Sequence, residues 1–179
     1  MLEDLVQQMS KVIIALDQST KVSGYSIYKD GLLNDYGHIS PSGDYLVRIT
    51  KLIKWLENEI LKNKNEEILI LLEDIQLQAT PDSGEKFNVL TFKKLAHCQG
   101  ALLYYLVKNQ INYEIVPSTV WKSRCKIKGT QREIQKKNAQ KYVLDTFGIE
   151  ATQDEADAIC IGKSYLIETE NDVSFDWSD

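Results

Sequence analysis

The chain has 179 residues, 43% of them hydrophobic, which is enough to bury one substantial core. No apolar run is long enough to span a membrane, and the acidic start of the chain is unlike a basic secretory signal. We therefore expect one domain over residues 1–179, with a core at 11–168, an acidic tail at 170–179 and a cytoplasmic location.

The formal net charge of −5 argues mildly against a negatively charged partner, but the charges are unevenly distributed. Basic residues outnumber acidic ones between Lys86 and Lys141, whereas acidic residues concentrate towards both ends. This segment could form a basic face for nucleic acid, or simply the solvated sides of helices. The cysteines, Cys98, Cys125 and Cys160, include no Cys-x-x-Cys pair, so the sequence indicates neither a disulfide framework nor a zinc site.

Two apolar runs end on carboxylates. Val12–Leu16 is followed by Asp17, and Ile68–Leu72 is followed by Glu73 and Asp74. Such runs predict strands that are buried on both faces. If the two strands are parallel neighbours, Asp17 and Glu73 lie at the same edge of the sheet, where open α/β sheets carry their sites.

The remaining elements are predicted from turn and helix signals. Alternating residues and the Asp30–Gly31 turn predict strands at 25–28 and 32–39, and a further short strand is predicted at 113–116, before a basic loop that runs from Ser118 to Gly129. Helices are predicted at 46–60, from a capping box at Asp82–Glu85 to 109, from a second box at Thr130–Glu133 to Phe147, and from a third box at Thr152–Glu155 to about 168. This order predicts an α/β fold in which helices flank a mixed central sheet.

Two further carboxylates, Asp154 and Asp157, are three residues apart on the last predicted helix and therefore share a face. If that face meets the edge with Asp17 and Glu73, four carboxylates converge and raise one another's pKa values unless cations neutralise them. Oxygen-only ligation favours Mg²⁺ or Mn²⁺ over zinc. Two such ions are an arrangement that supports phosphodiester hydrolysis.

Each carboxylate also has a simpler interpretation. Glu73 could be a solvated residue at a strand end, and Asp154 could serve only the helix dipole. Asp157 is harder to explain in this way, because it interrupts an otherwise apolar stretch, Ala156–Gly162, in which an unpaired charge would be costly.

In combination these segments resemble the RuvC-type Holliday junction resolvases, a branch of the ribonuclease H-like superfamily. The resemblance covers most of residues 11–168 and rests on Ala15–Ser19 with Gly24, on Leu72–Asp74 and on Asp154–Ala158. It is strongest to the divergent bacteriophage versions, which would place the protein in the cytoplasm of a host cell.

The resemblance implies a ribonuclease H-like fold and an endodeoxyribonuclease that cuts branched DNA, such as four-way junctions, forks and flaps. It implies that Asp17, Glu73, Asp154 and Asp157 bind two Mg²⁺ ions per site, for which Mn²⁺ can substitute.

The resemblance also implies catalytic roles for two lysines and a homodimeric assembly. Lys122 and Lys137 stand where the lysines are expected, and Lys136 is an adjacent alternative to Lys137. Two symmetric cuts need two sites, while one chain supplies one. We predict the dimer surface on the helix that ends at Asn109, through Phe87, Leu90 and Tyr104–Tyr105, for which core packing is the alternative interpretation.

One departure from the bacterial pattern is Gln76, which stands where those proteins carry an aromatic residue that packs against junction bases. A broader range of branched substrates is therefore expected. Rival interpretations are another ribonuclease H-like nuclease acting on RNA or RNA–DNA hybrid, and a non-catalytic junction-binding module. The Asp17–Ser19 segment is also similar to the phosphate-binding opening of actin-like sugar kinases, but the chain is too short for their two domains.

Overall fold

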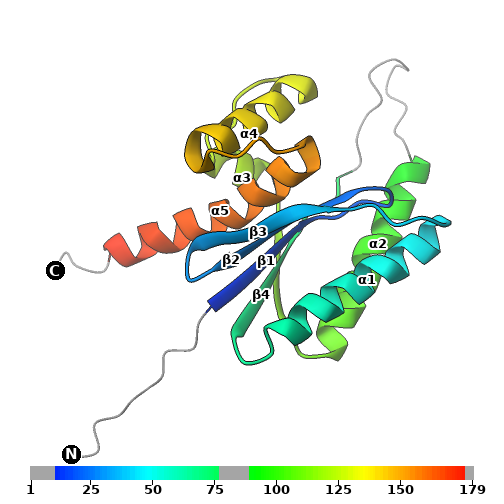
Figure 1. Cartoon of the computed structure of the whole chain (residues 1–179). Coiled ribbons are helices and arrows are strands. Elements are labelled where there is room, and N and C mark those ends of the chain that lie inside the picture. Colours follow the sequence, from blue (N-terminus) through cyan, green and yellow to red (C-terminus); the bar gives the residue numbers. More distant parts are fainter. Residues whose placement is uncertain (1–10, 77–88, 176–179) are drawn as a thin grey trace, which may run out of the picture.

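A five-stranded sheet, in the order β3-β2-β1-β4-β5, forms the centre of the protein (Figure 1). The structure, a computed structural model, describes residues 11–76 and 89–175. The predicted capping box at Asp82–Glu85 and the predicted dimer residue Phe87 lie outside these residues. In the part of the chain that the structure describes, no helix is both long and apolar enough to cross a membrane.

The first three strands form an antiparallel meander. β1 (Lys11–Asp17) pairs with β2 (Ser23–Lys29), and β2 pairs with β3 (Leu32–Ile39). Asp30 and Gly31 join the last two strands with φ angles of 49° and 80°, the left-handed backbone that a two-residue hairpin turn requires. The predicted turn is therefore confirmed.

The other two strands run parallel to β1. β4 (Glu67–Glu73) pairs with β1, and β5 (Asn112–Val116) pairs with β4. Leu16 is the register partner of Leu72. The residues that follow this pair, Asp17 and Glu73, therefore lie side by side at one edge of the sheet, as predicted.

Helices cover both faces of the sheet (Figure 1). α1 (Tyr45–Lys62) and α2 (Val89–Lys108) lie on one face. α5 (Gln153–Phe175) lies across the other, with α3 (Ser118–Arg124) and α4 (Arg132–Phe147) packed against it. The predicted α/β fold, with helices flanking a mixed sheet, is confirmed.

Residues of β1 alternate between the two hydrophobic layers. Ile13 and Ala15 pack in the layer under α5, whereas Ile14 and Leu16 pack in the layer under α1 and α2. All four residues are buried, which explains why the run is apolar at every position.

α5 lies unusually close to β2. The Ser26 hydroxyl donates a hydrogen bond to the Ala158 carbonyl oxygen and the Tyr28 hydroxyl donates one to that of Ile159, both at 2.8 Å. A Cβ atom placed on Gly162 would lie 2.4 Å from the Tyr28 ring, so only glycine fits there. These contacts hold the start of α5 in place relative to the sheet.

Two local predictions are wrong. Ser118–Arg124 forms the helix α3 and not a loop, because a helical turn buries Trp121 and Cys125, four residues apart, in the same core. α4 begins after an N-cap residue, Gln131, that provides no side-chain capping bond, so the capping box predicted at Thr130 does not form.

At α5 the predicted start is confirmed and the predicted end is wrong. The Thr152 amide donates to Glu155 Oε2 at 2.8 Å, and the Glu155 amide donates to Thr152 Oγ1 at 3.4 Å, which is the reciprocal pair of a capping box. The helix continues to Phe175 and does not end near Glu168. An ion pair of 3.4 Å between Lys163 and Glu170 supports the additional turns.

Candidate functional site

The ends of β1 and β4 bring two carboxyl groups together. Burial raises the pKa of Asp17 well above its usual range, and the nearby charges of Glu73, Asp157 and Asp154 raise it further. The contact between the Asp17 and Glu73 side chains also raises the pKa of Asp17. All four carboxyl groups predicted from the sequence are therefore close enough to interact at this edge.

The first two turns of α5 supply the other two carboxylates, and Gly24 allows the helix to come close enough. Gly24 is the register partner of Asp17 on β2. A Cβ atom on Gly24 would lie 1.9 Å from the carbonyl oxygen of Asp154, which is shorter than any contact two such atoms can make. Without a side chain at position 24, the backbone of α5 can rest directly on the strand beside Asp17.

Asp157 lies between acidic and basic groups. Burial and the charge of Glu73 raise its pKa, Asp154 raises it further, and Lys122 and Lys136 oppose the shift; the result is a pKa of about 7. A carboxyl group with this pKa is partly protonated at neutral pH, in contrast to an ordinary aspartate. The expectation that a charge within this apolar stretch has charged neighbours is therefore confirmed.

The two lysines near Asp157 come from different helices. Lys122 lies on α3, with its ammonium group 5.2 Å from the centre of the Trp121 ring. Lys136 lies on α4 and donates to Gln153 Oε1 at 2.7 Å. Lys137 is exposed, and its catalytic role stays a prediction, whereas the neighbouring alternative, Lys136, is the lysine whose charge acts on Asp157.

Three residues that hold Glu73 were not predicted. Trp121 Nε1 donates to Glu73 Oε1 at 2.9 Å, which orients the carboxylate. Gln18 and Gln99 both donate from Nε2 to the Glu73 carbonyl oxygen, with the Gln99 bond at 3.1 Å. For Gln99 the sequence carried a signal, because a glutamine stands in the apolar face of a helix. For Trp121, which is 48 residues away from Glu73, the sequence carried no signal.

A cavity of about 630 Å³ opens at this edge of the sheet. Its lining combines three of the carboxylates with basic side chains from four parts of the chain. The carboxylates are Asp17, Glu73 and Asp154, and the basic residues are Lys21, Arg48, Lys94 and Arg132. A lining that combines acidic and basic side chains suits a ligand that is negatively charged and approaches through bound cations.

The donor set fits a hard divalent cation by its chemistry. All four groups are carboxylates, which are ligands that Mg²⁺, Mn²⁺ and Ca²⁺ prefer, and burial together with the charges of neighbouring carboxylates raises the pKa values of Asp17 and Asp157. Within the described residues, however, no three acidic, histidine or cysteine side chains already surround a common point as ligands of one ion do. The electrostatic interactions among the four carboxyl groups therefore support the binding of a divalent cation. The side chains would need small rotations to become its ligands.

Comparison with known proteins gives a result at the level of structure only. No family model matches the sequence, and neither does any curated protein. The structure of Thermus thermophilus RuvC in complex with Holliday junction substrate matches with a TM-score of 0.67 at 11% identity, covering 90% of this chain and 96% of that one. Thermus thermophilus RuvC alone matches with a TM-score of 0.64, at the same identity and coverage.

A third solved structure comes from a different organism. The yeast mitochondrial Holliday junction resolvase Ydc2 matches with a TM-score of 0.56 at 14% identity, covering 91% of this chain and 80% of that one. All three matches cover about nine-tenths of this chain. The protein therefore has the RuvC-like form of the ribonuclease H-like fold.

Proposed function

We propose that this protein is a metal-dependent endonuclease that hydrolyses phosphodiester bonds in branched DNA, with four-way junctions as its principal substrate. The observation that carries the proposal is the convergence of Asp17, Glu73, Asp154 and Asp157 at the end of β1, where burial and neighbouring carboxylates raise the pKa values of Asp17 and Asp157. Convergent carboxylates beside a cavity with basic side chains in its lining are suited to phosphodiester chemistry.

The four carboxylates would hold two divalent ions, with Mg²⁺ as the expected metal and Mn²⁺ as a substitute. Such ions activate a water molecule and stabilise charge on the attacking and leaving oxygens. Trp121 and the two glutamines, Gln18 and Gln99, keep Glu73 in position through its carboxylate and its carbonyl group. The protein thus supplies a preorganised set of oxygen ligands.

Lysine charges complete the proposed site. Lys122 and Lys136 act on Asp157, so their ammonium groups are near the place where the scissile phosphate would lie. They would stabilise the negative charge that develops there, and the basic side chains in the lining of the cavity would bind neighbouring phosphates. Lys137 keeps the role predicted from the resemblance, as a further phosphate contact on the same helix.

We further propose that two copies assemble into a homodimer, so that both strands of a junction are cut. α2 exposes large apolar side chains that find no cover within the described part of the chain. They are Val89, Leu90, Tyr104 and Val107, with exposed fractions of 61%, 74%, 69% and 61%. An apolar helix face of this kind is typical of a protein interface.

The test uses Asp17→Asn and Asp157→Asn proteins with labelled four-way, forked, duplex and RNA–DNA hybrid substrates, in Mg²⁺ and in Mn²⁺. We expect wild-type protein to cut the four-way junction preferentially. Both variants should bind the junction but lose at least about 100-fold in cleavage, because the carboxylate set is incomplete. Cleavage retained in both variants would contradict the mechanism. Preferred cutting of the RNA–DNA hybrid would mean that the hybrid, and not branched DNA, is the substrate.

A further inference from the structure

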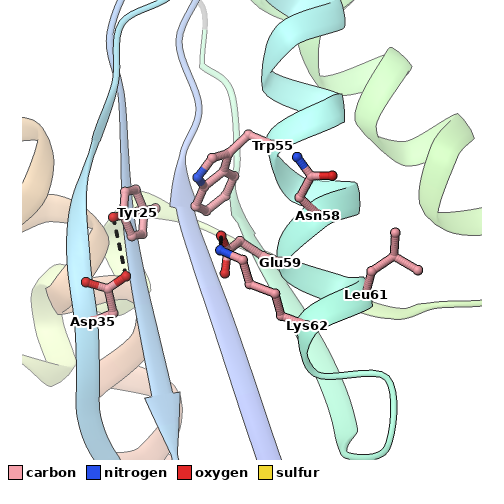
Figure 2. A pocket seen from close by; sticks show the side chains of 7 residues that line it. All are labelled: Tyr25, Asp35, Trp55, Asn58, Glu59, Leu61 and Lys62. Carbon is pink, nitrogen blue, oxygen red and sulfur yellow. Dashed lines mark hydrogen bonds and ion pairs between the residues drawn. The ribbon is translucent and has the colours of Figure 1, made fainter.

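A second cavity, of about 720 Å³, shares no lining residue with the carboxylate cavity among the described residues. Figure 2 shows its two walls, one formed by β2 and β3 and the other by the C-terminal half of α1. Tyr25 and Asp35 lie on the strand wall, and Trp55, Glu59 and Lys62 lie on the helix wall. The proposed nuclease function makes no use of these side chains.

Two aromatic rings lie next to each other in this cavity. The ring centres of Tyr25 and Trp55 are 4.6 Å apart, with their planes tilted by 46°. The Tyr25 hydroxyl donates a long hydrogen bond, of 3.4 Å, to the exposed carboxylate of Asp35. Because the faces of aromatic rings attract cations, a carboxylate beside two rings forms a setting for a positively charged group.

Glu59 adds a second carboxylate from the opposite wall. It lies on the inward stripe of α1 with Leu52 and Leu56, and only 8% of it is exposed. Burial of an unpaired carboxylate is costly, and here the Lys62 ammonium group lies 2.5 Å from Glu59 Oε1. The Lys62 side chain is 66% exposed, so this cation reaches Glu59 from the solvent side and another cation can replace it.

We propose that this cavity binds an arginine side chain in a basic segment of a partner protein. A guanidinium group is planar, stacks on rings such as Trp55, and donates paired hydrogen bonds to carboxylates such as Asp35 and Glu59. Two carboxylates in the lining repel phosphate groups, so charge complementarity favours a basic protein segment over nucleic acid.

The test titrates the full chain with the peptide acetyl-Gly-Arg-Gly-Arg-Gly-amide and follows the indole N–H resonance of Trp55 by NMR. The matched control peptide carries citrulline in place of both arginines, which keeps the shape and removes the charge. We expect a saturable shift with the arginine peptide and none with the citrulline peptide.

Variants then assign the binding to the cavity. Asp35→Asn and Glu59→Gln should each weaken binding about tenfold, because each removes a charged acceptor. Lys62→Ala should tighten binding, since it removes the cation that competes for Glu59. Glu57→Gln, on the same helix but outside the cavity lining, removes the same charge and should leave the affinity unchanged.

Three results would overturn the proposal. They are equal binding of the citrulline peptide, equal weakening by Glu57→Gln, and binding of spermidine as tight as that of the peptide, which would make the cavity a polyamine site. Asp157→Asn protein should bind the arginine peptide like wild type. The outcome is therefore independent of whether the protein is a nuclease.

Discussion

Asp157 is the residue whose surroundings reveal most about the site. Its sequence context, a charge within an apolar stretch, already required a partner. The structure surrounds it with Glu73 and Asp154 on one side and with Lys122 and Lys136 on the other, and its pKa is about 7. Burial and the charges of the two carboxylates together outweigh the opposing effect of the two lysines on this pKa, and a divalent cation would stabilise the ionised form of Asp157.

The raised pKa of Asp157 predicts a pH-dependent stability. The native state holds this proton more tightly than the unfolded chain, where the pKa is about 4. Without metal, the free energy of unfolding should therefore fall as pH rises from about 4 to 7 and then level off. The contribution of Asp157 to this decrease is on the order of 4 kcal/mol. Urea denaturation in EDTA measures this dependence.

Two comparisons complete this experiment. In Asp157→Asn protein the dependence on pH should be weaker by the contribution of Asp157, while the raised pKa of Asp17 keeps part of it. Addition of Mg²⁺ at pH 8 should restore stability to wild type and not to the variant. A wild-type protein that is as stable in EDTA at pH 8 as at pH 5 would contradict the pKa assigned to Asp157.

At the scale of elements, the contact between β2 and α5 decides whether the site forms. β1 and β4 bring Asp17 and Glu73 to the edge by strand pairing alone. Asp154 and Asp157 reach them only because α5 lies directly on β2, where Gly24 and Gly162 leave room for it.

We predict that Gly24→Ala destabilises the fold and disrupts the site. The new Cβ would lie 1.9 Å from the Asp154 carbonyl oxygen, and relief of such overpacking costs roughly 1–3 kcal/mol. Cleavage should fall sharply as Asp154 moves away from Asp17.

Gly100→Ala is the matched control: it lies in α2 with open space around the new methyl group, and should stabilise the helix by about 0.5–1 kcal/mol. Equal effects of the two changes would refute the close-contact explanation, and both are measured by thermal unfolding.

At the scale of the whole molecule, an acidic protein with a net charge of −5 presents basic groups around one cavity. The proposed binding of DNA would then depend on local charge and not on net charge. α3 and α4, which carry Lys122 and Lys136, extend the basic surface beside the carboxylate edge.

We predict that Lys122→Ala, made in an inactive Asp17→Asn background, weakens junction binding and lowers its salt dependence. The slope of log K against log [salt] should become smaller by about 1, because one phosphate contact is lost. Lys54→Ala, an exposed change on α1, should leave the slope unaltered. Fluorescence anisotropy between about 50 and 200 mM salt measures the affinity and its salt dependence. Identical slopes for the Asp17→Asn protein and for the same protein with Lys122→Ala or Lys54→Ala would exclude Lys122 from the interface.

The proposed dimer makes a separate prediction. Tyr104→Glu places a charge in the exposed apolar face of α2 and should convert dimers to monomers, as measured by sedimentation velocity. Leu144→Glu, at an exposed apolar position on α4, is the control and should leave the assembly intact. A wild-type protein that sediments as a monomer at all concentrations would remove the dimer proposal.

Much of the site could be predicted because its carboxylates follow strong local signals. Asp17 and Glu73 end apolar strands, and Asp154 and Asp157 share the first turns of a capped helix. The α3 helix was missed because its burial depends on a core that other segments build. The extent of the domain over 1–179, the bacteriophage type and the cytoplasmic location stay predictions from the sequence.

The sequence by itself determined which side chains could act and on which elements they lie, since apolar periodicity and caps are local properties of the chain. Only the tertiary structure decided how close they come. Gly24 permits a backbone contact with Asp154, Trp121 orients Glu73 from 48 residues away, and Lys136 is the helix neighbour whose charge acts on Asp157. These contacts join segments distant in sequence, and their distances depend on how whole layers pack, which no local pattern specifies.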